Sequence, residues 1–272
     1  MLVPNASTSG QRIDTEMLDF RALPAGCLAG IISLTSPLDV YRLSLVSPFF
    51  NSVASSDAVW VKFLPADYQN LVPASPSVSS LKNLYLSLCD HPVLIEDGRK
   101  SFSLHKRSGK KCYMLAARDF TITWGDIPRY WSWNSVPDSR FPEVAELLAV
   151  CWFEINGMIS TCKLSSMTHY KAYLVFKLTA TVYGFGNEPI EATIQLSGTG
   201  DLQRIVFLHA EGEDVQNDYR YPIEREDGWL ELELGEFFNE VGQDGKLEIR
   251  IFRFNGRWKG GVIIEGIEIR PN

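Results

Sequence analysis

The stretch Leu247-Glu248-Ile249-Arg250-Ile251 alternates apolar and charged residues with a period of two. Leu230-Glu231-Leu232-Glu233-Leu234 lies upstream and Ile267-Glu268-Ile269-Arg270 lies downstream, and both repeat the pattern. Because successive side chains of a strand point to opposite faces, each segment is predicted to be a strand with one face on a core and one in water. This pattern is typical of antiparallel sheets.

Further upstream, Val150–Ile155 and Tyr170–Leu178 are richer in apolar and aromatic residues and are predicted to be more central strands. Pairs such as Asp244-Gly245 and Asn255-Gly256 mark turns between strands. Eight or more short strands without long intervening helices indicate an antiparallel β-sandwich, of the jelly-roll type. The fold class is therefore α+β and multidomain, because the N-terminal quarter of the chain has a helical pattern instead.

The N-terminal segment from Leu23 to Leu64 is mostly hydrophobic, and its only charged residues are Asp39, Arg42, Asp57 and Lys62. Apolar residues spaced three and four apart predict the buried faces of two or three short helices: Leu28, Ile31, Ile32, Leu43, Val46, Phe49, Phe50 and Val53. Ser36-Pro37 and Ser47-Pro48 are predicted helix breaks, with Pro in a first turn. Helices this short are marginal alone, so another surface must cover them.

These residues resemble an F-box, on the following motifs: Leu23-Pro24, Cys27-Leu28, Ile31–Ser33, Ser36–Val40, Arg42–Ser47, Phe50, Ser56-Asp57, Val59-Trp60 and Phe63–Pro65. The resemblance implies docking onto the Skp-type adaptor of a cullin–RING ubiquitin ligase. The residues that it implies at the interface or supporting it are Leu23, Pro24, Leu28, Ile32, Pro37, Leu43, Val46 and Trp60. The alternative is an ordinary helical subdomain that packs on the rest of the chain.

Composition limits the other classes of function. A net charge of -7 over 272 residues argues against nonspecific nucleic-acid binding, which needs a basic surface. The five cysteines and four histidines show no metal-ligand spacing, so neither a metal nor another cofactor is expected. The first residues carry no secretory signal, and no apolar run is long enough for a membrane span. The chain is therefore predicted in the cytoplasm, the nucleus or both.

Four parts are predicted along the chain. Residues 1–17 form a disordered N-terminus, and residues 18–65 form the F-box-like segment. Residues 66–111 form a linker that includes a short helix over Leu81–Leu88. Residues 112–272 form the β-sandwich.

The C-terminal part resembles a phloem-protein-2-type lectin over most of residues 110–272. The matching motifs are Ala116–Asp126, Tyr130–Trp133, Glu143–Leu147, Trp152–Ile155, Asp227–Glu231, Leu234–Asn239 and Gly266–Asn272. An F-box followed by such a domain is a recurrent plant architecture. The two resemblances together imply a non-catalytic substrate receptor of an SCF-type ubiquitin ligase, whose sandwich recognises a target protein or glycoprotein.

Trp124, Trp131 and Trp133 are the candidate carbohydrate-binding residues. Aromatic rings pack against the C–H patches of a pyranose, and on an extended segment Trp131 and Trp133 share a face. In the lectins that the chain resembles, the tryptophans matching Trp124 and Trp131 are implicated in binding N-acetylglucosamine-containing glycans. The alternative is that they are core residues, as is assumed for Trp152, Trp229 and Trp258.

Two further positions bear on sugar specificity. They are acidic in well-characterised lectins of this type but are Lys246 and Arg253 here. Carboxylates accept hydrogen bonds from sugar hydroxyls, whereas these cations only donate. The resemblance therefore implies the fold and leaves the ligand open.

A catalytic function has little support in the sequence. On one strand face Glu231 and Glu233 would lie about 7 Å apart, near the spacing of inverting glycosidase carboxylates. Alternating glutamates are more typical of a solvated face, and no nucleophile elbow, P-loop or dinucleotide motif accompanies them. Two alternatives to a glycan-binding ligase receptor remain: a stand-alone cytosolic or nuclear lectin or defence-type interaction protein, and a ligase receptor whose sandwich binds protein without sugar.

Overall fold

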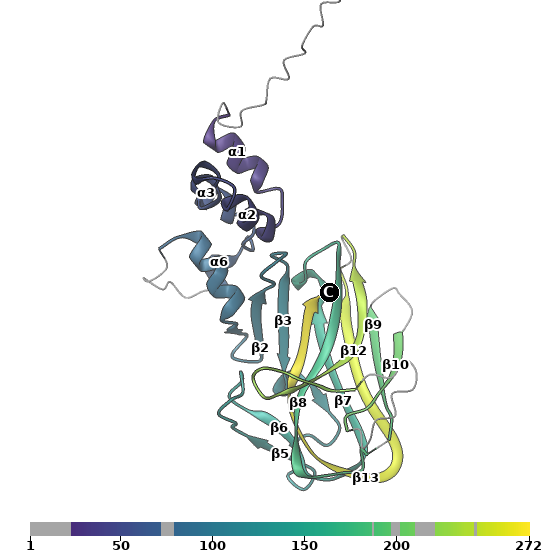
Figure 1. Ribbon diagram of the computed structural model, residues 1–272. Helices are drawn as coiled ribbons and strands as arrows, with labels where there is room; N and C mark the ends of the chain where they lie inside the picture. Colours follow the sequence, from purple (N-terminus) through teal and green to yellow (C-terminus); the bar gives the residue numbers. More distant parts are fainter. Residues whose placement is uncertain (1–22, 72–78, 187, 197–201, 210–220, 242–243) are drawn as a thin grey trace, which may run out of the picture.

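The computed structural model describes residues 23–71, 79–186, 188–196, 202–209, 221–241 and 244–272. The predicted disordered segment 1–17 and the start of the predicted F-box-like segment lie outside these ranges. Figure 1 shows a group of short helices beside a β-structure that takes up the rest of the chain. No helix in the described part is long and apolar enough to span a membrane.

The described helices are α1 (Ala25–Ile32), α2 (Pro37–Ser44), α3 (Pro48–Ala54), α4 (Asp57–Trp60), α5 (Tyr68–Leu71) and α6 (Leu81–Asp90). Four of them begin with a serine whose hydroxyl accepts a hydrogen bond from a first-turn N–H group: Ser36, Ser47, Ser56 and Ser80. Pro37 and Pro48 occupy the first turns of α2 and α3, where a missing N–H costs nothing. The predicted breaks and the predicted helix over Leu81–Leu88 are confirmed.

Two aromatic residues join the helices to the β-structure. Trp60 donates its indole hydrogen to the Ala54 carbonyl at 2.7 Å, and its ring lies 5.0 Å from that of Tyr85 in α6. The Tyr85 hydroxyl lies 3.2 Å from the His105 carbonyl and 3.1 Å from the Lys106 carbonyl. Buried residues of the helices and of the strands form one continuous hydrophobic core. The helices are therefore packed on the β-structure.

The described strands are β1 (Val93–Ile95), β2 (Lys100–Leu104), β3 (Lys111–Ala116), β4 (Thr121–Ile122), β5 (Trp131–Asn134), β6 (Val144–Leu147), β7 (Val150–Ser160), β8 (Thr168–Tyr183), β9 (Ile190–Leu196), β10 (Leu202–Val206), β11 (Ile223–Glu224), β12 (Leu230–Asn239) and β13 (Lys246–Pro271). The pairings between these strands are antiparallel. The predicted antiparallel architecture is confirmed.

Strand β13 belongs to two layers. Its first half pairs with β7 and β9, and the layer continues through β4 and β10. Its second half pairs with β3, β6 and β8, and the layer continues through β1, β2, β5, β11 and β12. In Figure 1 this long yellow strand curves at the bottom of the β-structure. Buried side chains from both halves, such as Ile249 and Ile267, fill the core between the layers.

The change of direction in β13 depends on glycine. The pairing of β13 with β7 is interrupted between Phe254 and Lys259, and Gly260 and Gly261 follow. A Cβ atom on Gly260 would lie 2.2 Å from the Leu148 carbonyl oxygen, and Gly261 has a φ of +82°. Only a residue without a side chain fits both the space and the backbone conformation.

The sheet begins earlier in the chain than the sequence predicts. The predicted linker, 66–111, contains α5 and α6 but also β1 and β2, which pair with each other and with β3. The strand pattern of β2 is not visible in the sequence, because a charged residue normally marks a water-facing position whereas Lys100 of β2 is buried. Its ammonium group lies 2.6 Å from Glu96 and 2.9 Å from Asp119, and these ion pairs make burial tolerable.

The predicted water-facing side of the C-terminal strands instead carries a network of ion pairs. Glu268 is 9% exposed and lies 2.7 Å from Arg225, 2.8 Å from Arg270 and 3.8 Å from Arg140. Glu231 pairs with Arg270 at 2.7 Å. Burial by itself would raise the pKa of Glu268. The nearby arginines lower this pKa by a larger amount, so it lies below its ordinary value.

Replacing Glu268 by Gln should destabilise the protein by about 3–5 kcal/mol, because it removes the charge of a buried carboxylate that three half-buried arginines share. The matched control is Asp90→Asn, which removes a solvent-exposed pair with Lys106 and should cost far less stability. Urea unfolding at pH 7 measures both. Equal losses would contradict the structural role of Glu268.

The same network predicts acid sensitivity. The lowered pKa of folded Glu268 means that its stabilisation is present above its unfolded pKa, about 4.3. This stabilisation is lost as the pH falls through the folded pKa. The gap in unfolding free energy between wild type and Glu268→Gln should therefore narrow from pH 5 to pH 2, and a constant gap would contradict the prediction.

Candidate functional site

The helical segment contains the residues predicted for adaptor binding, and the structure divides them into a core set and a surface set. The core set is buried: Leu28, Ile32, Pro37 and Trp60. Leu43 is half-buried, and the surface set is exposed: Leu23, Pro24 and Val46. The buried set shapes the helices, and the exposed set is free to contact another molecule.

Several large apolar side chains of this segment are exposed. Within residues 23–46 they are Leu23, Ile31, Leu34, Tyr41, Leu45 and Val46. Leu34 is 87% exposed and Leu45 is 70% exposed. Single exposed apolar residues are common, but a concentration in one short segment is typical of a surface that another protein covers. We call Leu23, Ile31, Leu34, Leu45 and Val46 the helical apolar surface.

Two of these residues were assigned to buried helix faces from the sequence, and that assignment is wrong. Ile31 is exposed because α1 is only eight residues long and buries a narrow stripe, and Val46 is exposed because it lies in the turn after α2 ends at Ser44. The buried stripe of α1 consists of Leu28, Ala29 and Ile32. Leu34 follows the end of α1, so periodicity carries no signal for its exposure.

Of the three candidate tryptophans, Trp131 is a core residue. It is 2% exposed, and its ring stacks on Phe153 with a centroid distance of 6.4 Å. Its indole donates a hydrogen bond to the Thr123 carbonyl at 3.2 Å. Trp131 therefore supports the turn around Trp124 and offers no open face to a ligand.

Trp133, two residues further along β5, supports the same turn. Its indole donates to the Gly125 carbonyl at 3.0 Å, so Trp131 and Trp133 both bond to residues 123–125. The Arg118 guanidinium lies 3.6 Å from the centre of the Trp133 ring and covers it. Trp133 is half-buried and is better suited to positioning than to stacking on a sugar.

Of the three candidate tryptophans, Trp124 has the most solvent-exposed ring. It is 38% exposed and packs against Tyr130, with ring centroids 5.3 Å apart. Its φ of +60° is left-handed, which costs a bulky residue on the order of 1–2 kcal/mol. Gly125 makes the turn tight, because a Cβ atom there would lie 2.9 Å from Ile122 Cβ. An exposed aromatic ring on a strained backbone is a candidate binding feature.

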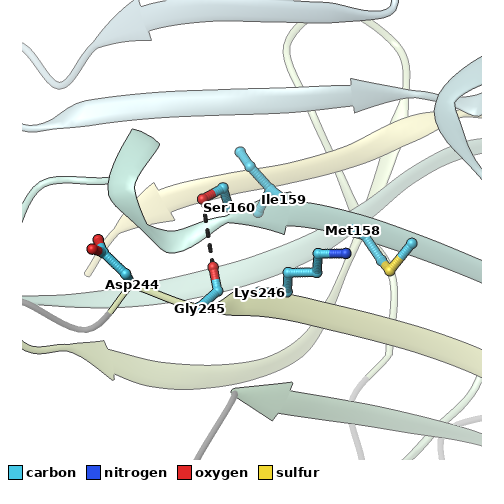
Figure 2. A pocket seen from close by; sticks show the side chains of 6 residues that line it. All are labelled: Met158, Ile159, Ser160, Asp244, Gly245 and Lys246. Carbon is cyan, nitrogen blue, oxygen red and sulfur yellow. Dashed lines mark hydrogen bonds between the residues drawn. The ribbon is translucent and has the colours of Figure 1, made fainter.

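The two positions that are acidic in the lectin relatives lie far apart. Lys246 and Arg253 are seven residues apart on β13 and so about 23 Å apart, on opposite faces. Arg253 pairs with Glu188 at 3.3 Å. Lys246 lines a hollow of about 400 Å³ with Met158, Ser160 and Asp244. Figure 2 shows the Lys246 side chain extending toward Met158.

The hydrolase alternative has no support in the geometry of Glu231 and Glu233. Glu231 pairs with Arg225 and Arg270, and Glu233 pairs with Lys171 at 3.1 Å and Arg204 at 2.7 Å. These ion pairs occupy both carboxylates. Among the described residues no group of His, Cys, Asp or Glu is arranged to hold a metal ion.

Comparison with known proteins assigns the chain to a family. The family model for phloem protein 2 matches residues 110–271, from the start of β3 almost to the C-terminus. The chain belongs to the phloem protein 2 family of F-box proteins. It is 45% identical to the F-box protein PP2-B10 of Arabidopsis thaliana, over 96% of this chain and 97% of that protein. It is 40% identical to the Arabidopsis F-box protein SKIP3, over 100% of this chain and 94% of the relative.

Solved structures of carbohydrate-binding modules resemble this family member only distantly. The CBM22-1 xylan-binding domain of Paenibacillus barcinonensis Xyn10C has 11% identity and a TM-score of 0.32, covering 57% of this chain and 87% of that domain. TmCBM61, in complex with β-1,4-galactotriose, has 12% identity and the same TM-score of 0.32, covering 58% and 91%. Such scores are too low to transfer a ligand or a site.

The different environments of two tryptophans predict different costs of truncation. Trp131→Ala should destabilise the protein by about 3–5 kcal/mol, because it leaves a cavity in the core and removes the bond to Thr123. Trp124→Ala should cost less than about 1 kcal/mol, since the ring is exposed and alanine keeps the Cβ atom, which leaves the left-handed strain unchanged. Urea unfolding of the two variants tests this. A larger loss for Trp124→Ala than for Trp131→Ala would reverse the assignment.

Proposed function

We propose that this protein is the substrate-receptor subunit of an SCF-type cullin–RING ubiquitin ligase. The F-box names of its relatives support this proposal, and so does the helical apolar surface, which is the observation that carries it. Residues 23–64 act as the F-box and bind a Skp-type adaptor, while the β-structure recognises the target. Its working compartment is the cytoplasm, the nucleus or both.

The predicted adaptor residues have two roles in this proposal. Leu28, Ile32, Pro37 and Trp60 form the core that fixes the relative positions of α1 to α4. Leu23, Pro24 and Val46 contact the adaptor, together with the newly identified Leu34 and Leu45. Covering apolar side chains of this size contributes about 1.5–3 kcal/mol for each that becomes fully buried. A few such residues are enough to anchor a stable interface.

The receptor needs no catalytic side chain. Its contribution is to hold lysines of a bound target near the charged conjugating enzyme, which raises their effective concentration. The Trp60–Tyr85 packing and the bonds from Tyr85 to the 105–106 turn support this role, because they hold the helices firmly against the β-structure. A firm connection keeps the distance from adaptor to target constant.

For the target we propose a glycoprotein bearing N-acetylglucosamine, recognised at the turn around Trp124. The open Trp124 ring supplies the stacking surface, and Trp131 and Trp133 position the turn from below. The alternative is a stand-alone lectin without a ligase role. Its support is the continuous core that joins the helices to the sheet, since helices that serve only as internal structure would also pack this way.

Adaptor binding separates the two proposals. Purified wild-type chain should co-purify with a Skp-type adaptor, and the Leu23→Ala/Pro24→Ala double variant should not. Val46→Asp should reduce adaptor affinity at least tenfold, because it places a charge in an apolar interface. The matched control is Val241→Asp, since Val241 is 71% exposed and Val46 is 66% exposed.

Circular dichroism and an unfolding transition must show that each variant keeps the β-structure. The ligase proposal is contradicted if folded wild-type protein fails to bind the adaptor, or if the helical and Val241 variants bind equally well. In that case the stand-alone lectin becomes the leading proposal.

A further inference from the structure

Two tryptophans that the sequence assigned to the core are at the surface. Trp229 is 0% exposed as assumed, but Trp152 is 47% exposed and Trp258 is 51% exposed. Trp152 lies in β7, opposite Phe254 of β13, and Phe254 is 42% exposed. An exposed aromatic pair at the end of a regular strand pairing needs an explanation, since β7 offers many positions that bury a ring.

The alternation of side chains places these rings on the outer face of the layer. Along β7, Phe153 and Ile155 are buried in the core, so Trp152, Glu154 and Asn156 point outward. On β13 their direct partners are Phe254, Phe252 and Arg250. These side chains therefore form two adjacent rows on one surface. We call Trp152, Glu154, Arg250, Phe252 and Phe254 the outer platform.

The rings of the outer platform are close enough to act as one surface. Trp152 and Phe254 have ring centroids 4.4 Å apart and planes inclined by 51°. Phe252 and Phe254 are 5.2 Å apart and nearly parallel, at 28°. The Arg250 guanidinium lies 4.5 Å from the centre of the Phe252 ring and continues the surface. Three rings and a flat cation thus form a continuous face.

Polar groups border this face in fixed positions. Glu154 accepts hydrogen bonds from Arg250 at 2.7 Å, from Thr123 at 3.0 Å and from the Trp152 indole at 3.4 Å. Burial raises the pKa of Glu154, but the bonds from Arg250 and Thr123 lower it below its ordinary value, so the carboxylate is charged at neutral pH. Its geometry is fixed before any ligand arrives.

The polar border continues beyond the rings. The Asn156 amide donates to Glu248 at 2.5 Å, while its Oδ1 atom is buried and has no partner within the described residues. Further along the same face, Met158, Ser160 and Lys246 line the hollow of Figure 2. From Trp152 to Ser160 the row extends about 26 Å along β7. This length suits an extended chain of several units.

We propose that the outer platform and the row beyond it form a saccharide-binding site for a neutral oligosaccharide chain that lies along β7. Pyranose C–H faces stack on the three rings, and hydroxyls bond to Glu154 and Arg250. Three acids and two bases face this row and its hollow, Glu154, Glu248 and Asp244 against Arg250 and Lys246, so the cations are not in excess. An uncharged ligand fits this balance better than nucleic acid does, because nucleic acid needs an excess of cations.

The chemistry also favours sugar over a protein segment. Charged and amide side chains follow directly after the rings along both strands, whereas a helix-binding groove would be lined by apolar residues. Over the middle of the β7–β13 pair an added strand is excluded, since β4 pairs with Ile155 and Asn156 of β7 and β9 pairs with Leu247–Phe252 of β13. The site requires neither adaptor docking nor the open ring of Trp124, so it stands apart from both parts of the proposed function.

The test measures binding of defined oligosaccharides to the full chain by isothermal titration calorimetry. The probes are chitohexaose, cellohexaose, xylohexaose and mannohexaose. Trp152→Ala and Phe254→Ala should each weaken binding of the best probe at least tenfold, and Trp152→Phe should keep most of it because an aromatic ring remains. The matched control is Phe238→Ala, which removes a phenylalanine that packs on His169 in the other layer. The saccharide affinity of this variant should equal that of wild type.

Trp124→Ala distinguishes the outer platform from the turn. The outer platform is overturned as a sugar site if Trp124→Ala loses saccharide affinity while folded Trp152→Ala and Phe254→Ala keep it. Absence of binding to all four probes at millimolar concentration would also overturn it. A third contradicting result is a protein ligand that binds through Trp152 when no saccharide binds. That result would assign the surface to protein recognition.

Discussion

The hydrogen-bonded pairing of β13 is the constraint on which the rest of the structure depends. This strand pairs with β7 and β9 in one layer and with β3, β6 and β8 in the other. The bend at Gly260 and Gly261 sets how the layers face each other. Because β7 is held against the first half of β13, the rings of Trp152 and Phe254 come together on the outside. The fold and its exposed aromatic surface therefore have a common origin.

The second constraint is the packing of the helices on the sheet. Trp60 and Tyr85 form the contact, and Tyr85 also reaches the backbone of the turn after β2. This packing leaves the helical apolar surface exposed, while Leu28, Ile32 and Trp60 are buried. A receptor that holds two partners at a fixed separation needs this combination of an open docking face and a firm base.

Local sequence patterns predicted much of this architecture. The alternation in Leu247–Ile251 and the Ser-Pro pairs before α2 and α3 are short-range signals, and the elements that they predicted formed. The length of β13 was hidden because turn residues such as Asn255-Gly256 interrupt the pattern within what is one strand in space. β2 was missed because Lys100 is buried in ion pairs with Glu96 and Asp119, which hydrophobic periodicity does not reveal.

The candidate sites were harder to predict because exposure depends on tertiary packing. Trp131 and Trp152 both lie in strands rich in aromatic residues, yet one is buried and the other is half exposed. The difference depends on which face of each strand packs on the core. When a strand carries apolar residues on both faces, its local sequence pattern does not predict which face is buried. For the same reason Ile31 looked buried, since a helix of eight residues cannot bury all its apolar side chains.

The most direct test of the ligase-receptor account is hydrogen–deuterium exchange of the full chain with and without a purified Skp-type adaptor. Segments that are covered by a partner exchange more slowly, because their local opening becomes costlier. The account predicts slower exchange in peptides that cover residues 23–64 and unchanged exchange in β7, β9 and β12. Unchanged exchange throughout the helices, or protection confined to the β-structure, would contradict it.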